Sequence, residues 1–206
     1  MFRFTKKLLQ SFNQPLAKPA ESSRVEVRPP RQRVIFRATS GFLLHVRQDL
    51  ERRHAFALER VGFITVRAAQ GAEGLVLLAE DYYPVADEHY VHDRSVGAMI
   101  GSEALRKALE LALLKGVGVF HVHMHGLTPR LWFSLVDLRE QVKFIPDFFT
   151  VCPQMPHGAI VLNAKTAAGR VWLGPDHITQ IDEFNTIGPR MMINGAAADG
   201  STGYYA

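Results

Sequence analysis

Three histidines at alternate positions, followed by a Ser-x-x-Asp pattern, are the residues of this sequence whose types could do chemistry. They lie in VFHVHMHGLTPRLWFSLVDLRE, residues 119–140. Side chains two residues apart on a strand share a face, so His121, His123 and His125 line up, and two neighbours can converge on one metal ion. A catalytic zinc takes three protein ligands, and Asp137 is the nearest candidate for the third. The pattern predicts a metal site at a strand end.

A purely structural interpretation competes with the metal site. A histidine in an apolar strand is more often a hydrogen-bonded core residue than a ligand. Ser134 and Asp137 also fit a capping box, in which a helix begins at a serine and an acidic side chain three residues later binds back to it. Each fragment alone leaves both interpretations open. The combination of His-x-His, a glycine turn, a short apolar loop and Ser-x-x-Asp favours the metal site.

The elements that must position these residues follow from hydrophobic periodicity and from turn and cap residues. We expect strands at 33–37, 61–68, 74–82, 117–123, 158–163, 170–173 and 177–184, and helices at 41–53, 102–115 and 134–142. We place hairpin turns at Gln70-Gly71 and around Ala167–Gly169, and expect Ser40 to cap the first helix. This order predicts an α/β (α+β) sandwich in which a mixed central β-sheet is flanked by helices.

The histidine stretch looks like the JAMM motif of JAB/MPN-domain metallopeptidases, which is His-x-His-Pro followed by a spacer and Ser-x-x-Asp. Gly126 stands where the family usually has proline, which aligns the ligand pair with His123 and His125 and leaves His121 spare. The spacer between His125 and Ser134 is one residue longer than the commonest form. The resemblance covers roughly residues 34–188 and implies a JAB/MPN-like fold.

The family also has a glutamate near the start of an early strand. Glu59 in LERVGFITV occupies that place, whereas Glu51 and Glu73 do not begin such a segment. The resemblance implies Zn²⁺ held by His123, His125 and Asp137. It implies that Glu59 is the proton acceptor and that Ser134 is the donor to the oxyanion.

Other residues of reactive type receive lesser roles. We expect His121 to lie beside the ligands in a supporting or packing role. Cys152 is not needed as a nucleophile, and we expect it to be structural. We expect His89 and His92 to be substrate-side or surface residues. Trp132 and Phe133 could form an apolar wall beside the metal or take part in ordinary packing.

Composition and charge restrict the setting of this chemistry. The single cysteine excludes an intrachain disulfide framework and is typical of a reducing compartment, so we expect a cytoplasmic protein without a membrane span or secretory signal. Residues 1–37 carry nine Lys/Arg against two Glu, whereas the rest of the chain is slightly acidic. We expect a basic, partly disordered arm at 1–30, the metallopeptidase domain at 31–188 and a flexible tail at 189–206.

The resemblance also implies a substrate class. JAB/MPN enzymes typically cleave the bond after the C-terminal glycine of ubiquitin or a ubiquitin-like protein. The HVHMHG form resembles variants from bacterial operons with E1-like and E2-like partners, some linked to antiphage (antiviral) defence. We expect a deubiquitinase-like isopeptidase or peptidase acting on a ubiquitin-like protein or its conjugates, with a homodimer left open.

Three alternatives remain at this point. One is a metallopeptidase that processes a sulfur-carrier-type precursor or small peptides, and another is a noncatalytic MPN scaffold. A nucleic-acid-binding module would depend on the basic arm alone, so nucleic acid is not expected as a partner.

Overall fold

The computed structural model describes residues 32–53, 57–93, 97–126 and 130–188. The predicted arm at 1–30 and the predicted tail at 189–206 lie outside these residues. Within the part of the chain that the structure describes, no helix is both long and apolar enough to cross a membrane.

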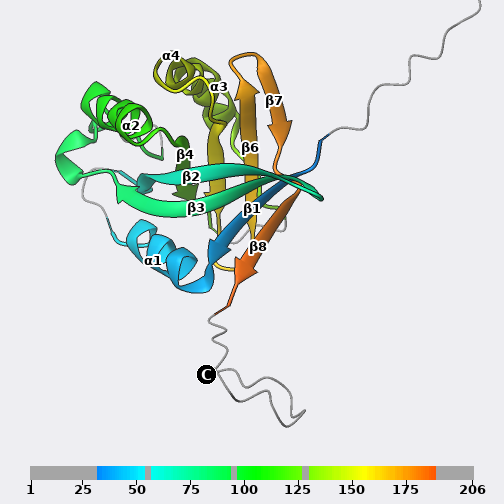
Figure 1. The fold of residues 1–206 in the computed structure, drawn as a ribbon. Coiled ribbons are helices and arrows are strands. Elements are labelled where there is room, and N and C mark those ends of the chain that lie inside the picture. The colour runs from blue at the N-terminus through cyan, green and yellow to red at the C-terminus, as the bar shows by residue number, and fades with distance from the viewer. Residues whose placement is uncertain (1–31, 54–56, 94–96, 127–129, 189–206) are drawn as a thin grey trace, which may run out of the picture. The chain divides into compact units, whose positions relative to one another are not determined.

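One mixed sheet of eight strands organises the described residues (Figure 1). The strands are β1 Val34–Thr39, β2 Val61–Gly71, β3 Gly74–Pro84, β4 Gly118–Met124, β5 His157–Leu162, β6 Ala167–Gly174, β7 His177–Gln180 and β8 Glu183–Ile187. Their order across the sheet is β7-β6-β5-β4-β2-β3-β1-β8. The pairs β1/β3, β1/β8 and β4/β5 are parallel, and the other neighbours are antiparallel. The predicted mixed sheet flanked by helices is therefore confirmed.

Helices cover both faces of the sheet (Figure 1). They are α1 Ser40–Leu50, α2 Ser102–Lys115, α3 Leu135–Phe144 and α4 Phe148–Val151, with short 3₁₀ turns η1 Asp87–His89 and η2 Ile145–Asp147. α1 packs its buried Val46 and Leu50 on one face, in a cluster that includes Phe120 and Val122 of β4. α2, α3 and α4 lie over the other face (Figure 1). Because alternate residues of a strand point to opposite faces, His121 and His123 belong to this second face.

The positions of two turns differ from the prediction. β2 and β3 extend to Gly71 and Gly74, so the hairpin turn is Ala72-Glu73 instead of Gln70-Gly71. The second hairpin turns at residues 163–166, where the Asn163 side chain accepts hydrogen bonds from the Lys165 and Thr166 amides. This side chain closes the turn earlier and leaves Ala167–Gly169 within β6.

Two further details of the expected elements are wrong. Thr39, not Ser40, caps α1, because its Oγ1 accepts a hydrogen bond from the Phe42 amide at 3.1 Å. The last predicted strand is divided at Ile181-Asp182, where the Ile181 amide bonds to Gly169 and the Asp182 amide bonds to Val34. Between these two residues the chain passes from β7, at one edge of the sheet, to β8, at the other edge. The single predicted strand therefore corresponds to both edge strands.

Candidate metal centre

β4, in the middle of the sheet, and the residue that follows it carry the two candidate histidine ligands. His123 pairs with Val61 of β2 on one side and with Val161 of β5 on the other, and its side chain is 1% exposed. His125 follows the last residue of the strand, and its amide donates a hydrogen bond to the Leu162 carbonyl at 2.9 Å. The strand and this one additional bond fix the backbone at both positions.

α3 presents the candidate carboxylate from its first turn. Ser134 is the N-cap, and its Oγ accepts a hydrogen bond from the Asp137 amide at 3.1 Å. The Ser134 amide in turn donates to Asp137 Oδ2 at 2.8 Å. A complete capping box is therefore present, and the structural interpretation of Ser-x-x-Asp is correct as far as it goes.

The same carboxylate oxygen also faces both histidines. Asp137 Oδ2 lies 3.4 Å from His123 Nε2 and 3.5 Å from His125 Nε2, and the two Nε2 atoms are 3.1 Å apart. An ion about 2.0–2.1 Å from each of three tetrahedral ligands holds those ligands about 3.3–3.4 Å apart. The three atoms therefore already have the mutual separations of ligands around one metal ion.

The charge state of Asp137 suits this arrangement. Its partial burial would raise the pKa, but hydrogen bonding and charge interaction with His123, together with the two hydrogen bonds from Ser134, lower it well below the ordinary value. The carboxylate is consequently ionised at neutral pH and available to a cation.

Glu59 lies next to this group at the entrance to β2. Its carboxylate and the ligand nitrogens of His123 and His125 all lie within 4.8 Å of one another, so these three residues could also hold a metal ion. Asp137 Oδ2, at 3.4 and 3.5 Å from the two nitrogens, offers a further oxygen to the same histidine pair. We call His123, His125 and Asp137 the inner set, because their three ligand atoms lie 3.1, 3.4 and 3.5 Å apart.

Aromatic packing orients the histidine rings. His121 lies between Phe63 and Phe144, with ring centroids at 5.8 and 5.6 Å, and its centroid is 5.5 Å from that of His123. Burial, with a smaller contribution from His123, lowers the pKa of His121 to about 3, so this ring is neutral at neutral pH. Among the described residues, neither His121 Nδ1 nor His123 Nδ1 has a hydrogen-bond partner. His121 therefore packs beside His123, as expected. Within the described residues, its Nδ1 makes no hydrogen bond to a candidate ligand.

Of Trp132 and Phe133, which could wall the site or take part in ordinary packing, Phe133 lies beside His123. Phe133 is buried, its ring centroid lies 6.1 Å from that of His123, and Trp132 packs edge-on against it. In the described residues, His89 and His92 do not join the metal-binding group. Cys152 is buried at the end of α4, and burial raises the pKa of its thiol.

Two residues that hold the segment around Glu59 were not predicted. Gly97 O accepts the amides of Leu58 and Glu59 at 2.8 and 3.0 Å, and a Cβ at Gly97 would lie 2.7 Å from Glu59 Oε2. Arg60, which is buried, bonds Asp87 and the carbonyls of Arg52 and Arg53. The sequence pattern around Gly97 does not indicate its contact with Glu59. Arg60 could have been noticed only because it directly follows Glu59.

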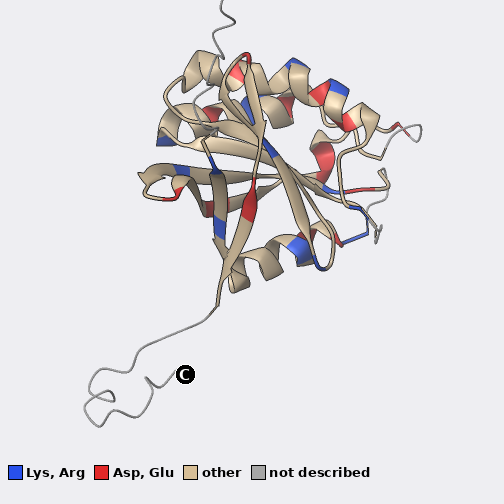
Figure 2. Cartoon of the chain, turned by 90° about the vertical axis from the view of Figure 1, so that its right-hand side faces the viewer, with Lys and Arg blue, Asp and Glu red and all other residues tan. Residues whose placement is uncertain are grey.

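Charge on the described elements is mixed in sign. On the side of the molecule turned to the viewer in Figure 2, Lys/Arg and Asp/Glu are interspersed along helices and strands. Among the described residues as a whole, several cations are paired, including Arg67 with Glu80 and Lys115 with Asp81. This side therefore lacks the one-sign basic surface that is typical of nucleic-acid-binding proteins.

Comparisons with known proteins do not assign a family. No family model matches the chain, and no curated protein matches it significantly. One similar solved structure is the STIL N-terminal domain of Trichoplax adhaerens, with 9% identity, a TM-score of 0.31 and 65% of this chain covered. The match spans 40% of that chain. A similarity at this level carries no functional argument, so the candidate site is interpreted from its own geometry.

Proposed function

We propose that this protein is a zinc-dependent isopeptidase or peptidase that removes or processes a ubiquitin-like protein in a bacterial conjugation system. The observation that supports the proposal is the triangle formed by His123 Nε2, His125 Nε2 and Asp137 Oδ2, with edges of 3.1, 3.4 and 3.5 Å. Glu59 stands beside this triangle, as a proton-transferring residue would.

The donor set fits zinc in its catalytic form. Two imidazole nitrogens and one carboxylate oxygen are the kind of ligands that catalytic zinc takes, with a fourth position left for water or substrate. His123, His125 and Asp137 would hold the ion. When bound, zinc supplies Lewis-acid polarisation of a carbonyl and lowers the pKa of water to about 7.

The residues of the chain would supply proton transfer and oxyanion binding. Glu59 would accept the proton of the attacking water and return it to the departing amine. Ser134, which the capping box places at the start of α3, would donate its hydroxyl hydrogen to the carbonyl oxygen. To do so the hydroxyl would have to turn away from the Asp137 carboxylate, whose pKa it lowers by hydrogen bonding.

The substrate class and biological setting come from the sequence resemblance. A ubiquitin-like C-terminus is extended, and an extended peptide can bind as an added strand. E1-like and E2-like operon partners, a cytoplasmic location and a role in antiphage defence belong to the same proposal.

The metal assignment is tested by zinc stoichiometry of purified variants. We expect wild type to hold one zinc ion, and His123→Ala and Asp137→Ala to lose it. Glu59→Gln should retain zinc, because Glu59 stands outside the inner set. His177→Ala, at an exposed position on β7, is the control. Unchanged zinc content in both ligand variants would refute the proposed ligands.

The reaction is tested on a linear fusion of a ubiquitin-like protein with wild type and Glu59→Gln. We expect Glu59→Gln to lower turnover by roughly 100-fold or more, the contribution typical of a positioned general base. Equal turnover would remove Glu59 from the mechanism. Cleavage of short peptides with no cleavage of the fusion would contradict the ubiquitin-like substrate class. Zinc binding without cleavage of either would favour the noncatalytic scaffold.

A further inference from the structure

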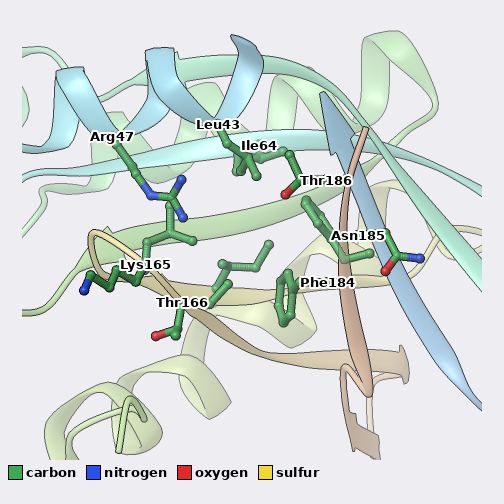
Figure 3. Close-up of a pocket in the computed structure, with 12 residues that line it drawn as sticks. Leu43, Arg47, Ile64, Lys165, Thr166, Phe184, Asn185 and Thr186 are labelled. Carbon is green, nitrogen blue, oxygen red and sulfur yellow. The ribbon is translucent and has the colours of Figure 1, made fainter. Parts of the chain in front are cut away.

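A cavity lies on the opposite face of the sheet from His123. It has a volume of about 160 Å³ and lies between α1, β8 and the β5–β6 turn (Figure 3). Its walls are mixed: the apolar side chains include Leu43, Ile64, Ile160 and Phe184, and the neutral polar residues are Thr166, Asn185 and Thr186. Ile64 and Ile160 belong to the buried cluster on the α1 side, so the sheet separates this space from the candidate metal centre.

Two cations border this cavity. Arg47 extends from α1 toward the β5–β6 turn, and the exposed Lys165 lies on that turn (Figure 3). Within the described part of the chain, no Asp or Glu lines the cavity. The cavity therefore combines apolar and neutral polar walls with positive charge.

The Arg47 guanidinium retains free donors. Its Nε donates to the Asn163 carbonyl at 3.0 Å, and it makes no ion pair with any described residue. Arg60, by contrast, is paired with Asp87, and Arg67 is paired with Glu80. Since the Nε bond fixes the plane of the guanidinium, its terminal N–H groups are already oriented for an acceptor.

We propose that this cavity binds a small organic carboxylate with a compact apolar body. A cavity of about 150 Å³ lined by apolar side chains accommodates benzene, so a single ring or a short branched chain fits the available volume. The carboxylate would accept charge-assisted hydrogen bonds from Arg47, with Lys165 adding positive charge at the rim. The site does not depend on the proposed hydrolase function.

The test is calorimetric titration of the full-length protein with four probes. Benzoate carries both features, benzyl alcohol lacks the charge, benzylamine reverses it, and acetate lacks the ring. We expect benzoate to bind roughly tenfold tighter than benzyl alcohol, the factor that corresponds to one charge-assisted hydrogen bond. Benzylamine and acetate should bind more weakly still. Equal affinities for benzoate and acetate, or for benzoate and benzyl alcohol, would overturn the proposal.

Variants locate the binding. Arg47→Gln should remove the preference for benzoate over benzyl alcohol, and Arg67→Gln, at an exposed ion pair outside the cavity, should leave it unchanged. If Arg47→Gln fails to fold, Ala167→Met tests the same site by filling part of the cavity, and it should weaken benzoate at least several-fold. The Asp137→Ala variant should bind benzoate as wild type does. Loss of binding in Asp137→Ala with no change in Arg47→Gln or Ala167→Met would assign the anion to the metal centre instead.

Discussion

The position of the Glu59 side chain depends on Gly97, a residue that has no side chain of its own. The Gly97 carbonyl binds two consecutive amides of the segment before β2, and the Glu59 carboxylate lies against the Gly97 Cα. Any side chain at Gly97 would occupy the space that the carboxylate takes. The distance from Glu59 to the histidines is therefore controlled by a neighbouring loop as well as by β2.

Gly97→Ala should impair turnover without removing the metal. The new Cβ would lie 2.7 Å from Glu59 Oε2, so the carboxylate must move. A displacement of about 1 Å at a reacting group can cost up to about 100-fold in rate, and we expect a loss of roughly 10- to 100-fold in kcat on the fusion substrate. Zinc content should stay at the wild-type value, because the three inner ligands are untouched.

Gly174→Ala is the matched control, since no described atom lies within 4 Å of a Cβ at that position. It should retain wild-type turnover. Wild-type turnover in Gly97→Ala would show that Glu59 can shift freely, or that its position does not limit the reaction.

At the scale of elements, the start of α3 performs two tasks with the same residues. The capping box stabilises the first turn, and the first turn brings Asp137 Oδ2 to the histidines. α1 begins with a similar cap, in which Thr39 Oγ1 accepts from the Phe42 amide, but that cap lies on the other face of the sheet. Variants of the two caps therefore separate the effect of a cap on the stability of the protein from its effect on the geometry of the site.

Ser134→Ala and Thr39→Ala should each lower the free energy of unfolding by about 1 kcal/mol, the usual cost of losing an N-cap side chain. Denaturant titration measures this loss. Only Ser134→Ala should also weaken zinc binding and lower turnover, because only that cap bonds to a ligand residue. Equal effects of both variants on zinc affinity would mean that general stability, not the position of Asp137, controls the metal.

Most elements could be predicted from sequence for physical reasons, and so could the proximity of His123, His125 and Asp137. α2 has a continuous run of helix formers ended by Gly116 in the left-handed conformation, and the structure places it at the predicted residues 102–115. The strand period predicts that the histidines share one face and the capping pattern places Asp137 in the first turn of a helix, but the choice of His123 and His125 over His121 came from the sequence resemblance. The contacts of Gly97 and Arg60 were not predictable, because they join segments distant in sequence through loops.

The register of turns was also hard to predict. The side chains of Asn163 and Thr39 decide where a turn closes and where a helix begins, through local hydrogen bonds. Neighbouring residues, such as Ser40 beside Thr39, are equally plausible for such bonds, so the sequence pattern does not select between them. The crossing at Ile181-Asp182 depends on backbone partners in two different strands, which no local pattern encodes.

At the scale of the whole molecule, a buried histidine ties together elements far from the site. His157 of β5 accepts a hydrogen bond from the Val119 amide on β4 at 3.1 Å and pairs with the Cys152 carbonyl at 3.0 Å. Its ring packs against Phe148 and Phe149. Burial lowers its pKa from 6.5 to about 4, because the neutral ring is the form that fits.

This pKa predicts acid destabilisation with a defined range. The unfolded chain binds a proton at His157 near pH 6.5 and the folded chain only near pH 4, so the contribution to stability is complete above pH 6.5. It is lost as the pH falls toward 4, by an amount on the order of 3 kcal/mol. Denaturant titrations at pH 7 and pH 4 should show a smaller difference for His157→Gln than for wild type. His177→Gln, at an exposed position, should behave as wild type. An unchanged pH dependence in His157→Gln would contradict this account.

The shared oxygen of Asp137 affects how strongly it would bind a cation. Oδ2 accepts from the Ser134 amide at 2.8 Å and lies at the amino end of α3, where the helix dipole is positive. Both draw electron density away from the side of the carboxylate that faces the histidines. The residue would therefore neutralise less of the charge of a bound ion than a free carboxylate would. A cation held there would keep more of its Lewis acidity for the substrate carbonyl.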